Sequence, residues 1–188
     1  MQLPLLTLVI GGAASGKSAF AEKMVRQSGL AKTYVATAEA FDDEMREKIA
    51  RHRADRSGQG WRTVEAPRHL TRALTTLDTD EVALVDCITL WLTNLMLDET
   101  PWQDALDILC DVLEHTATPI VLVSNDVSGG VIPENALARA FQVAQGRTNQ
   151  RLASQADLVV HVTAGLPRVL KGMHLANAGA GDDGDMWR

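Results

Sequence analysis

An apolar run at residues 5–10 leads directly into the sequence Gly-Gly-Ala-Ala-Ser-Gly-Lys-Ser at residues 11–18. This spacing is the pattern of a phosphate-binding loop between a strand and a helix. Glycines let the backbone curl so that its N–H groups point at phosphate oxygens, and the start of the helix adds a positive dipole. A glycine turn without a ligand does not account for both the spacing and its context. The residues expected to bind the nucleotide phosphates are Gly11, Gly12, Ala13, Ala14, Ser15, Gly16, Lys17 and Ser18.

Two of these residues have distinct roles in such a loop. Lys17 is expected to reach the β- and γ-phosphates of ATP or GTP, where its charge assists phosphoryl transfer. The Ser18 hydroxyl is expected to coordinate Mg²⁺.

The composition describes one ordinary globular domain. The chain has 188 residues, of which 46% are hydrophobic and 22% are charged. Its formal net charge of −6 argues against a general nucleic-acid binder, which would carry a basic face, but not against a local phosphate site. We expect residues 1–172 to form this domain and residues 173–188, which are rich in Ala, Gly and Asp, to form a mobile tail.

The sequence also predicts where the protein works. No apolar run approaches the roughly 18 residues that span a membrane, and the N-terminus lacks the basic start of a signal peptide. The two cysteines, Cys87 and Cys110, form no disulfide framework, which suits a reducing cytoplasm. Cys87 lies in an apolar strand, where a small core residue is favoured over a nucleophile.

Apolar, β-rich runs alternate with helical patterns along the chain. This alternation predicts an α/β fold with a mostly parallel sheet covered by helices. The strands are expected at residues 5–10, 33–37, 62–65, 82–86, 119–124 and 157–163. The helices are expected at residues 17–28, 42–55, 68–77, 102–115 and 134–155.

Gly11, Thr37, Glu65, Asp86 and Asn125 fall at or just past the ends of predicted strands. Ligands of such sheets bind at the carboxyl ends of the strands, so these residues should meet at one rim. We expect Thr37 and Glu65 to contribute to the nucleotide site. Glu65 suits a hydrogen bond from a base or ribose hydroxyl, although a structural helix cap explains it equally well.

Asp86 ends the buried run Val-Ala-Leu-Val-Asp at residues 82–86. An acidic residue at such a strand end, downstream of a phosphate loop, is the expected second anchor of Mg²⁺. The alternative is a helix N-cap for residues 87–97. The two roles are compatible, and we favour the metal role.

His52 lies in a segment of helical periodicity, residues 42–56, where it shares a face with Met45 and Ile49. Periodicity alone favours an exposed helix with a solvated histidine. However, Arg51 and Arg53 flank His52. A histidine among arginines is a plausible nucleophile toward a phosphate, because the cations offset the developing negative charge.

Two arginines lie one helical turn apart in the last predicted helix. Arg147 and Arg151 could meet either phosphate or acidic neighbours, and a solvated helix face is an equally good interpretation.

In their order along the chain, these motifs resemble the bifunctional adenosylcobinamide kinase/adenosylcobinamide-phosphate guanylyltransferase family of cobalamin biosynthesis. The resemblance covers about residues 1–171. One motif would be weak evidence, whereas the ordered set is specific. The matching segments are residues 11–18, 36–38, 43–45, 49–52, 61–65, 84–95, 121–125, 133–135, 146–147, 149–151 and 164–167.

The resemblance implies two reactions. The hydroxyl of adenosylcobinamide is phosphorylated with ATP or GTP, and GMP from GTP is then transferred to adenosylcobinamide-phosphate, giving adenosylcobinamide-GDP. The family passes GMP through a covalent histidine intermediate, and the matching position here is His52. The resemblance further implies a RecA-like P-loop fold and a homotrimer with nucleotide sites near subunit boundaries.

The chain departs from the family pattern at two places. An alanine, Ala14, stands where the family usually has arginine, and the sequence Asn-Asp-Val-Ser at residues 125–128 replaces Asn-Glu-Val-Gly. We expect the shorter carboxylate of Asp126 and the added side chain of Ser128 to shift the rim by about an ångström, enough to change rates by around 100-fold. The departures bear on kinase efficiency and nucleotide preference more than on the reaction class.

Two other functions fit parts of the same pattern. One keeps the fold but only a single activity, as a small-molecule kinase or a guanylyltransferase. The other is a RecA-like nucleotide-binding assembly module with weak hydrolysis. Such a module has no need of His52 between two arginines.

Overall fold

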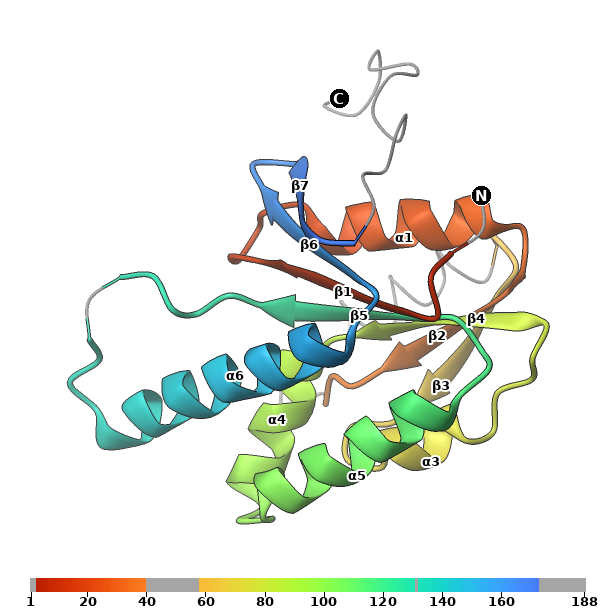
Figure 1. Ribbon diagram of the computed structural model, residues 1–188. Helices are drawn as coiled ribbons and strands as arrows, with labels where there is room; N and C mark the ends of the chain where they lie inside the picture. The colour runs from red at the N-terminus through yellow and green to blue at the C-terminus, as the bar shows by residue number, and fades with distance from the viewer. Residues whose placement is uncertain (1–2, 40–57, 131, 173–188) are drawn as a thin grey trace.

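The computed structural model describes residues 3–39, 58–130 and 132–172 of the chain. These residues form a sheet of seven strands in the order β3-β2-β4-β5-β1-β6-β7, with helices on both faces (Figure 1). The strands are β1 (Leu6–Gly11), β2 (Ala31–Ala36), β3 (Trp61–Glu65), β4 (Glu81–Asp86), β5 (Ile120–Asn125), β6 (Leu158–Thr163) and β7 (Leu166–Lys171). The helices are α1 (Lys17–Ser28), α3 (Leu70–Leu74), α4 (Ile88–Leu97), α5 (Trp102–His115) and α6 (Ala136–Gln155).

The sheet is parallel from β3 to β6, and only β7 runs antiparallel to its neighbour. The central strands are buried almost throughout because helices cover both of their faces, which explains their continuous apolar sequences. In the register of β1 and β5, Gly11 pairs with Asn125. The predicted mostly parallel α/β sheet is therefore confirmed.

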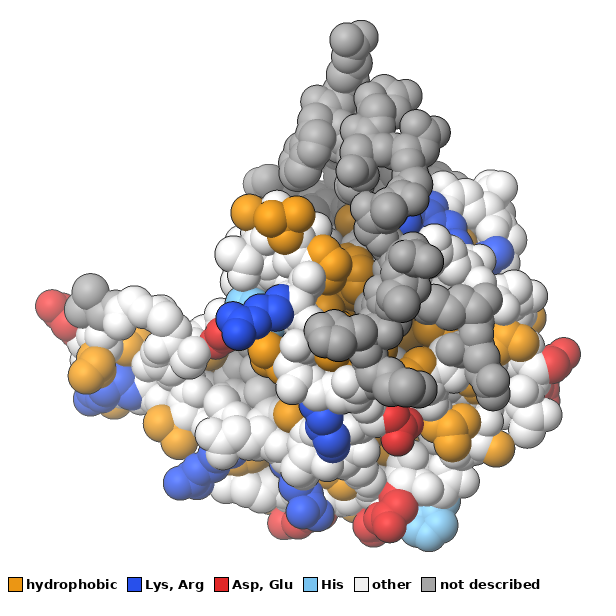
Figure 2. Space-filling view, turned by 45° about the horizontal axis from the view of Figure 1, so that its top comes forward, with side chains coloured by type: hydrophobic (Ala, Val, Ile, Leu, Met, Phe, Trp, Pro, Cys, Tyr) orange, Lys and Arg blue, Asp and Glu red, His pale blue; other side chains and the backbone are white. Residues whose placement is uncertain are grey.

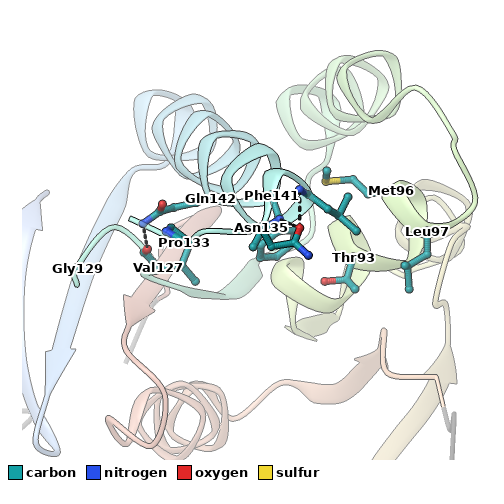
Figure 3. A pocket seen from close by; sticks show the side chains of 11 residues that line it. Thr93, Met96, Leu97, Val127, Gly129, Pro133, Asn135, Phe141 and Gln142 are labelled. Carbon is teal, nitrogen blue, oxygen red and sulfur yellow. Dashed lines mark hydrogen bonds between the residues drawn. The ribbon is translucent and has the colours of Figure 1, made fainter. Parts of the chain in front are cut away.

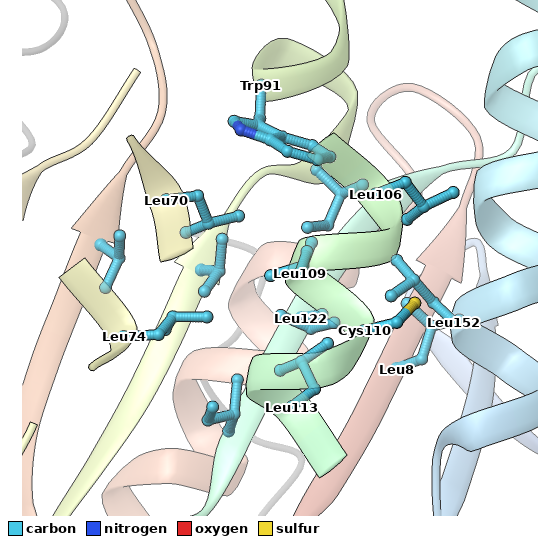
Figure 4. Close-up of a cluster of buried hydrophobic side chains, with 14 of the residues drawn as sticks. Leu8, Leu70, Leu74, Trp91, Leu106, Leu109, Cys110, Leu113, Leu122 and Leu152 are labelled. Atoms are coloured by element: carbon cyan, nitrogen blue, oxygen red, sulfur yellow. The ribbon is translucent and has the colours of Figure 1, made fainter. Parts of the chain in front are cut away.

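The core lies in two layers, one on each side of the sheet. The smaller layer packs under α1 and includes Met24, Tyr34 and Val123. The larger lies between the sheet and the helices α3, α4, α5 and α6 (Figure 4). The labelled side chains of this layer are Leu8, Leu70, Leu74, Trp91, Leu106, Leu109, Cys110, Leu113, Leu122 and Leu152.

Both cysteines are buried and unpaired. Burial, followed by the charge of Asp86, raises the pKa of the Cys87 thiol to about 11. The thiol therefore stays protonated at neutral pH, and the thiolate is the nucleophilic form. The prediction that Cys87 is a core residue is confirmed.

Several element predictions were wrong in part. The helix expected at residues 68–77 is shorter, Leu70–Leu74, because the hydroxyls of Thr75 and Thr76 donate to carbonyls three residues back. The last helix begins at Ala136 instead of residue 134, because the side chain of Asn135 accepts hydrogen bonds from two N–H groups of its first turn. The helix expected at residues 42–55 and the expected tail at 173–188 lie outside the described residues.

Strand β7 was absent from the predicted set, and the helix α4 entered it only as residues 87–97, the segment that Asp86 would cap. Helix α4 is mostly apolar, so it shows little amphipathic periodicity. Strand β7 is largely exposed and contains Pro167, which is tolerated at a sheet edge. A turn at Ala164 and Gly165, with φ angles of 50° and 78°, connects it to β6. Positive φ at both central residues is the geometry of a tight hairpin.

Asn94 connects three segments in the core below the rim of the sheet. Its side-chain amide donates to the carbonyls of Thr37 and Pro67, each at 2.9 Å, and the residue is 1% exposed. Asn94→Ala would leave both carbonyls unpaired, so we expect it to lower the free energy of unfolding by about 2–4 kcal/mol. Urea denaturation measures this loss. Gln103→Ala, at an exposed position of α5, is the matched control, and an equal effect of the two changes would contradict the role of Asn94.

Candidate functional site

The phosphate-binding loop connects the end of β1 at Gly11 to the start of α1 at Lys17. Gly16 caps the helix with a φ of 90°, a conformation that L side chains rarely adopt. The Nζ atom of Lys17 donates to the carbonyl of Gly12 at 3.2 Å, which holds the charge over the loop. The predicted strand–loop–helix arrangement is therefore present, with a partly buried cation and the N-terminus of a helix twelve residues long at one place.

The turn between β6 and β7 supports this loop. The N–H of Gly165 donates to the carbonyl of Ser15 at 2.8 Å. A Cβ on Gly16 would lie 3.1 Å from the Cα of Gly165, and a Cβ on Gly11 would lie 2.5 Å from the carbonyl oxygen of Val162. Both glycines are therefore needed for the close approach of the loop to β6 and the β6–β7 turn. This support was not predicted from the sequence, because no pattern in it indicated β7.

Asp86 lies at the carboxyl end of β4, separated from β1 only by β5. The hydroxyl of Tyr34 donates to its carboxylate Oδ2 atom at 3.0 Å. The charges of Asp86 and Lys17 both act on the pKa of the Cys87 thiol, which places the two groups around the same strand end. The N-cap of α4 is Cys87, without a side-chain cap, so the capping alternative for Asp86 was wrong.

The oxygen donors at this rim suit Mg²⁺. A carboxylate on Asp86 and a hydroxyl on Ser18 are hard ligands, and Mg²⁺ usually takes its remaining ligands from phosphates and water. Within residues 3–39, 58–130 and 132–172, no three His, Cys, Asp or Glu side chains gather into a metal-binding group. The residues therefore fit a cation that arrives with the nucleotide rather than one held by protein ligands alone.

Thr37 follows β2 and is fully buried. Its hydroxyl donates to the carbonyl of Cys87 and accepts from the N–H of Cys87, each at 2.7 Å. Thr37 thus holds the backbone of the residue that follows Asp86, and its expected role at the nucleotide is indirect in this geometry.

Glu65 ends β3 at the edge of the sheet, four strands from β1. With a strand spacing of about 4.8 Å, the two strand ends are about 19 Å apart across the sheet, so Glu65 is not brought to the phosphate loop. The N-cap of α3 is His69, and Glu65 is therefore not the cap of that helix.

A second polar cluster lies beside the loop and consists of Asp126, Ser128 and His161. In the sequence, Asp126 and Ser128 stood out only as departures from the family pattern. The N–H of Asp126 donates to the carbonyl of Gly11 at 3.0 Å. Its carboxylate Oδ1 atom accepts hydrogen bonds from the N–H and the hydroxyl of Ser128, at 2.9 and 2.5 Å, and Oδ2 faces the Nε2 atom of His161 at 3.6 Å. The hydrogen bonds from Ser128 are the main reason that the pKa of Asp126 lies below its usual value.

A cavity of about 580 Å³ opens between α4, the β5–α6 connection and the start of α6 (Figure 3). Its lining is mainly apolar, with Met96, Leu97 and Phe141 on the helices. Val127 and Gly129 line it from the β5–α6 connection, and the side chain of Gln142 fixes that connection by donating to the carbonyl of Val127 at 2.8 Å. The cavity therefore begins next to Asp126.

Arg147 and Arg151 are both exposed on α6. The guanidinium of Arg151 lies 4.0 Å from the carboxylate of Asp107, the acidic neighbour that was one of the alternatives. Arg151 also lines a hollow with Leu5 and Leu6, at the end of the sheet opposite the phosphate loop. His52 and its two neighbouring arginines lie outside the described residues.

The surface shown in Figure 2 carries Lys and Arg side chains scattered among acidic and apolar ones, without a continuous basic stripe over the described residues. None of the described helices is long and apolar enough to cross a membrane.

Comparison of the structure with solved proteins identifies its fold. The RadB recombinase matches with a TM-score of 0.52 and 18% identity, over 85% of this chain and 74% of that protein. A Pyrococcus horikoshii protein, PH0250, matches with a TM-score of 0.52 and 10% identity, over 93% and 89% of the two chains. Both likenesses concern the fold alone, and they confirm the expected RecA-like P-loop architecture.

Comparison of the sequence identifies its relatives. A bifunctional adenosylcobalamin biosynthesis protein, CobP of Pseudomonas aeruginosa, is 42% identical over 168 residues, which are 88% of this chain and 96% of that protein. CobU of Salmonella typhimurium, described in the same words, is 38% identical over 178 residues, 86% of this chain and 97% of that protein. The family model described as cobinamide kinase / cobinamide phosphate guanyltransferase matches residues 7–170. With the phosphate loop at its amino end and this agreement over nearly its whole length, the chain belongs to the cobinamide kinase / cobinamide phosphate guanyltransferase family.

Proposed function

We propose that this protein catalyses two successive reactions on a corrinoid. It phosphorylates adenosylcobinamide with ATP or GTP, and it then transfers GMP from GTP to adenosylcobinamide-phosphate, releasing pyrophosphate and giving adenosylcobinamide-GDP. The observation that carries the proposal is the phosphate loop, with Lys17 at the start of α1 and Asp86 on the same rim. Family membership supports the choice of substrates.

In the first reaction, the acceptor hydroxyl attacks the γ-phosphorus while the bond from that phosphorus to the β,γ-bridging oxygen breaks. Lys17 offsets charge on the β- and γ-phosphates, and backbone N–H groups of the loop orient them. Ser18 and Asp86 would hold Mg²⁺, which when bound neutralises phosphate charge. Thr37 and Tyr34 act through Asp86, by fixing the backbone beyond it and by donating to its carboxylate.

In the second reaction, we propose His52 as the nucleophile. Its imidazole attacks the α-phosphorus of GTP, pyrophosphate leaves, and the resulting phosphoramidate is then attacked by the phosphate of adenosylcobinamide-phosphate. Arg51 and Arg53 would offset the charge of the departing pyrophosphate. Glu65 remains a candidate for contact with the base or ribose. The resemblance of the ordered motifs supports these assignments.

We further propose that the enzyme works in the cytoplasm as a homotrimer. The free cysteines support a reducing compartment. Exposed large apolar side chains outside the cavity, among them Ile132, Val143 and Leu166, offer surface for subunit contact. Light scattering after size-exclusion chromatography measures the mass, and a monomer at micromolar concentration would contradict the trimer.

The overall function is tested by supplying each corrinoid separately. Purified protein with Mg²⁺, ATP and adenosylcobinamide should yield the phosphate, and with GTP and adenosylcobinamide-phosphate it should yield the GDP derivative, each identified by mass spectrometry. One product without the other would support a single-activity enzyme. Nucleotide binding with neither product would support the assembly module.

The metal role of Asp86 makes a separate prediction. Asp86→Asn keeps the shape of the side chain and removes its charge, so we expect the Mg²⁺ concentration for half-maximal phosphoryl transfer to rise about tenfold and the rate to fall. A Mg²⁺ titration of the rate, together with calorimetry of nucleotide binding with and without Mg²⁺, measures the effect. Asp104→Asn, at an exposed position of α5, is the control. A titration curve like that of the unaltered protein would remove Asp86 from the metal site.

A further inference from the structure

We propose that Asp126 binds and orients the hydroxyl that accepts the phosphoryl group, and that Ser128 and His161 are positioning residues that hold its carboxylate beside the phosphate loop. The proposal rests on the proposed function, because it assigns a residue to the first of the two reactions.

Asp126 follows the strand that lies between the phosphate-loop strand and the Asp86 strand. Strand β5 lies between β1, which leads into the phosphate loop, and β4, which ends at Asp86. Gly11 and Asn125 are paired at the ends of β1 and β5, and the next residue, Asp126, bonds through its N–H to the carbonyl of Gly11. Asp126 therefore lies next to the phosphate loop, and its carboxylate reaches across the end of β1 toward His161 on β6, on the rim where phosphoryl transfer would occur.

The carboxylate of Asp126 has one oxygen fully hydrogen-bonded and one that can accept from a ligand. Ser128 saturates one oxygen with two hydrogen bonds, whereas the distance of 3.6 Å from Oδ2 to His161 exceeds a hydrogen bond. The side chain of Asp126 is 36% exposed, so Oδ2 keeps lone pairs for another donor. Because its pKa is lowered, the group is ionised at neutral pH. The ionised carboxylate of Asp126 repels phosphate oxygens, so it is suited to accept a hydrogen bond from a hydroxyl and not to bind the nucleotide phosphates.

The cavity beside Asp126 offers room for the rest of the acceptor. Val127 and Gly129, on either side of Ser128, line the apolar cavity of about 580 Å³. The cavity therefore opens from the same stretch of backbone that holds Asp126. An acceptor whose hydroxyl reaches Oδ2 would place its apolar part against the walls formed by Met96, Leu97 and Phe141.

His161 is held from several sides. It lies on β6 next to Ile10 of β1, and its Nδ1 atom is 3.1 Å from the hydroxyl of Thr163. The charged groups that face it are Asp126 on the β5–α6 connection and Arg168, its partner across the β6–β7 pairing. This arrangement limits the directions in which the Asp126 carboxylate can turn.

The proton balance follows from the lowered pKa. Asp126 is a weak base, so it orients the hydroxyl in the ground state and does not remove its proton early. As the bond between the acceptor oxygen and the γ-phosphorus forms and the bond to the bridging oxygen breaks, the attacking oxygen becomes acidic. Its proton then passes to Oδ2 of Asp126 and on to water, while the nucleoside diphosphate leaves with the bonding electrons.

The test compares the two reactions in D126N, S128A and H161Q. We expect D126N to lower kcat for phosphorylation of adenosylcobinamide by about 10- to 100-fold, with nucleotide affinity and Mg²⁺ dependence unchanged. Guanylyl transfer to supplied adenosylcobinamide-phosphate should persist in D126N, because that acceptor has no hydroxyl to orient. The retained second reaction also reports that the variant folds.

Positioning is tested by non-additivity. S128A and H161Q should each slow phosphorylation by about tenfold or less, yet neither should slow it further when combined with D126N. His115→Gln, at an exposed position at the opposite end of the sheet, is the control for H161Q. Equal losses in both reactions, a raised Mg²⁺ requirement in D126N or fully additive effects would overturn the proposal. A wild type without either reaction would instead overturn the proposed function, and this role with it.

Discussion

Lys17→Ala is expected to reduce phosphoryl transfer by about 100-fold or more, because it removes the cation that stabilises charge on the transferring phosphate. Lys17 is partly buried, and its side chain donates a hydrogen bond to the carbonyl of Gly12 within the same loop. Truncation therefore removes charge from the site and little from the core, and the free energy of unfolding should change by less than about 1 kcal/mol.

The measurement combines steady-state rates of both reactions with calorimetric binding of ATP and GTP. Lys23→Ala is the matched control, since Lys23 is an exposed lysine on the same helix. Triphosphate binding should weaken in Lys17→Ala and remain normal in Lys23→Ala. Turnover near the wild-type value in both reactions of Lys17→Ala would show that the loop is not the phosphate site.

The parts of the site that the sequence predicted are local in the chain. The phosphate loop lies within residues 11–18, so the same short segment carries the strand end, the glycines and the helix start. Asp86 was predicted because a polar residue at the end of a buried strand is conspicuous. The order of the strands then determines which of these ends are neighbours, and it sets Glu65 apart from the loop.

The parts that were missed depend on contacts between distant segments. Asp126 and His161 are separated by 35 positions, and the two meet only because β5 and β6 both flank β1. Likewise, the support of the loop by Gly165 requires a hairpin whose second strand is largely exposed. The apolar cavity beside α4 was missed because α4 itself has no periodic pattern.

The departures from the family pattern also depend on contacts between distant segments. From the sequence, the shorter carboxylate of Asp126 suggested that the carboxyl end of the sheet is displaced. In the structure, Ser128 and His161 surround that carboxylate, and its backbone bonds to Gly11. The two departures at residues 126 and 128 are thus in direct contact, and their effects on activity should be coupled rather than independent.

His52→Ala is expected to abolish guanylyl transfer while leaving phosphorylation of adenosylcobinamide measurable. An imidazole must be unprotonated to attack the α-phosphorus, and its reference pKa of about 6.5 makes that form common near neutral pH. Arg51 and Arg53 would disfavour the imidazolium further, as like charges. Phosphorylation relies on a direct transfer supported by Lys17 and Asp86, so it does not require a covalent enzyme intermediate.

Incubation with α-labelled GTP and Mg²⁺, followed by denaturation, measures the intermediate directly. The wild type should retain label through a bond that is labile in acid and stable in alkali, as expected of a phosphoramidate, and His52→Ala should retain none. His115→Ala is the matched control: His115 is exposed at the end of α5, opposite the phosphate loop, and its loss should leave labelling intact. Full labelling of His52→Ala would exclude this histidine as the nucleophile and direct attention to His69. A wild type that retains no label would instead indicate direct attack by the corrinoid phosphate.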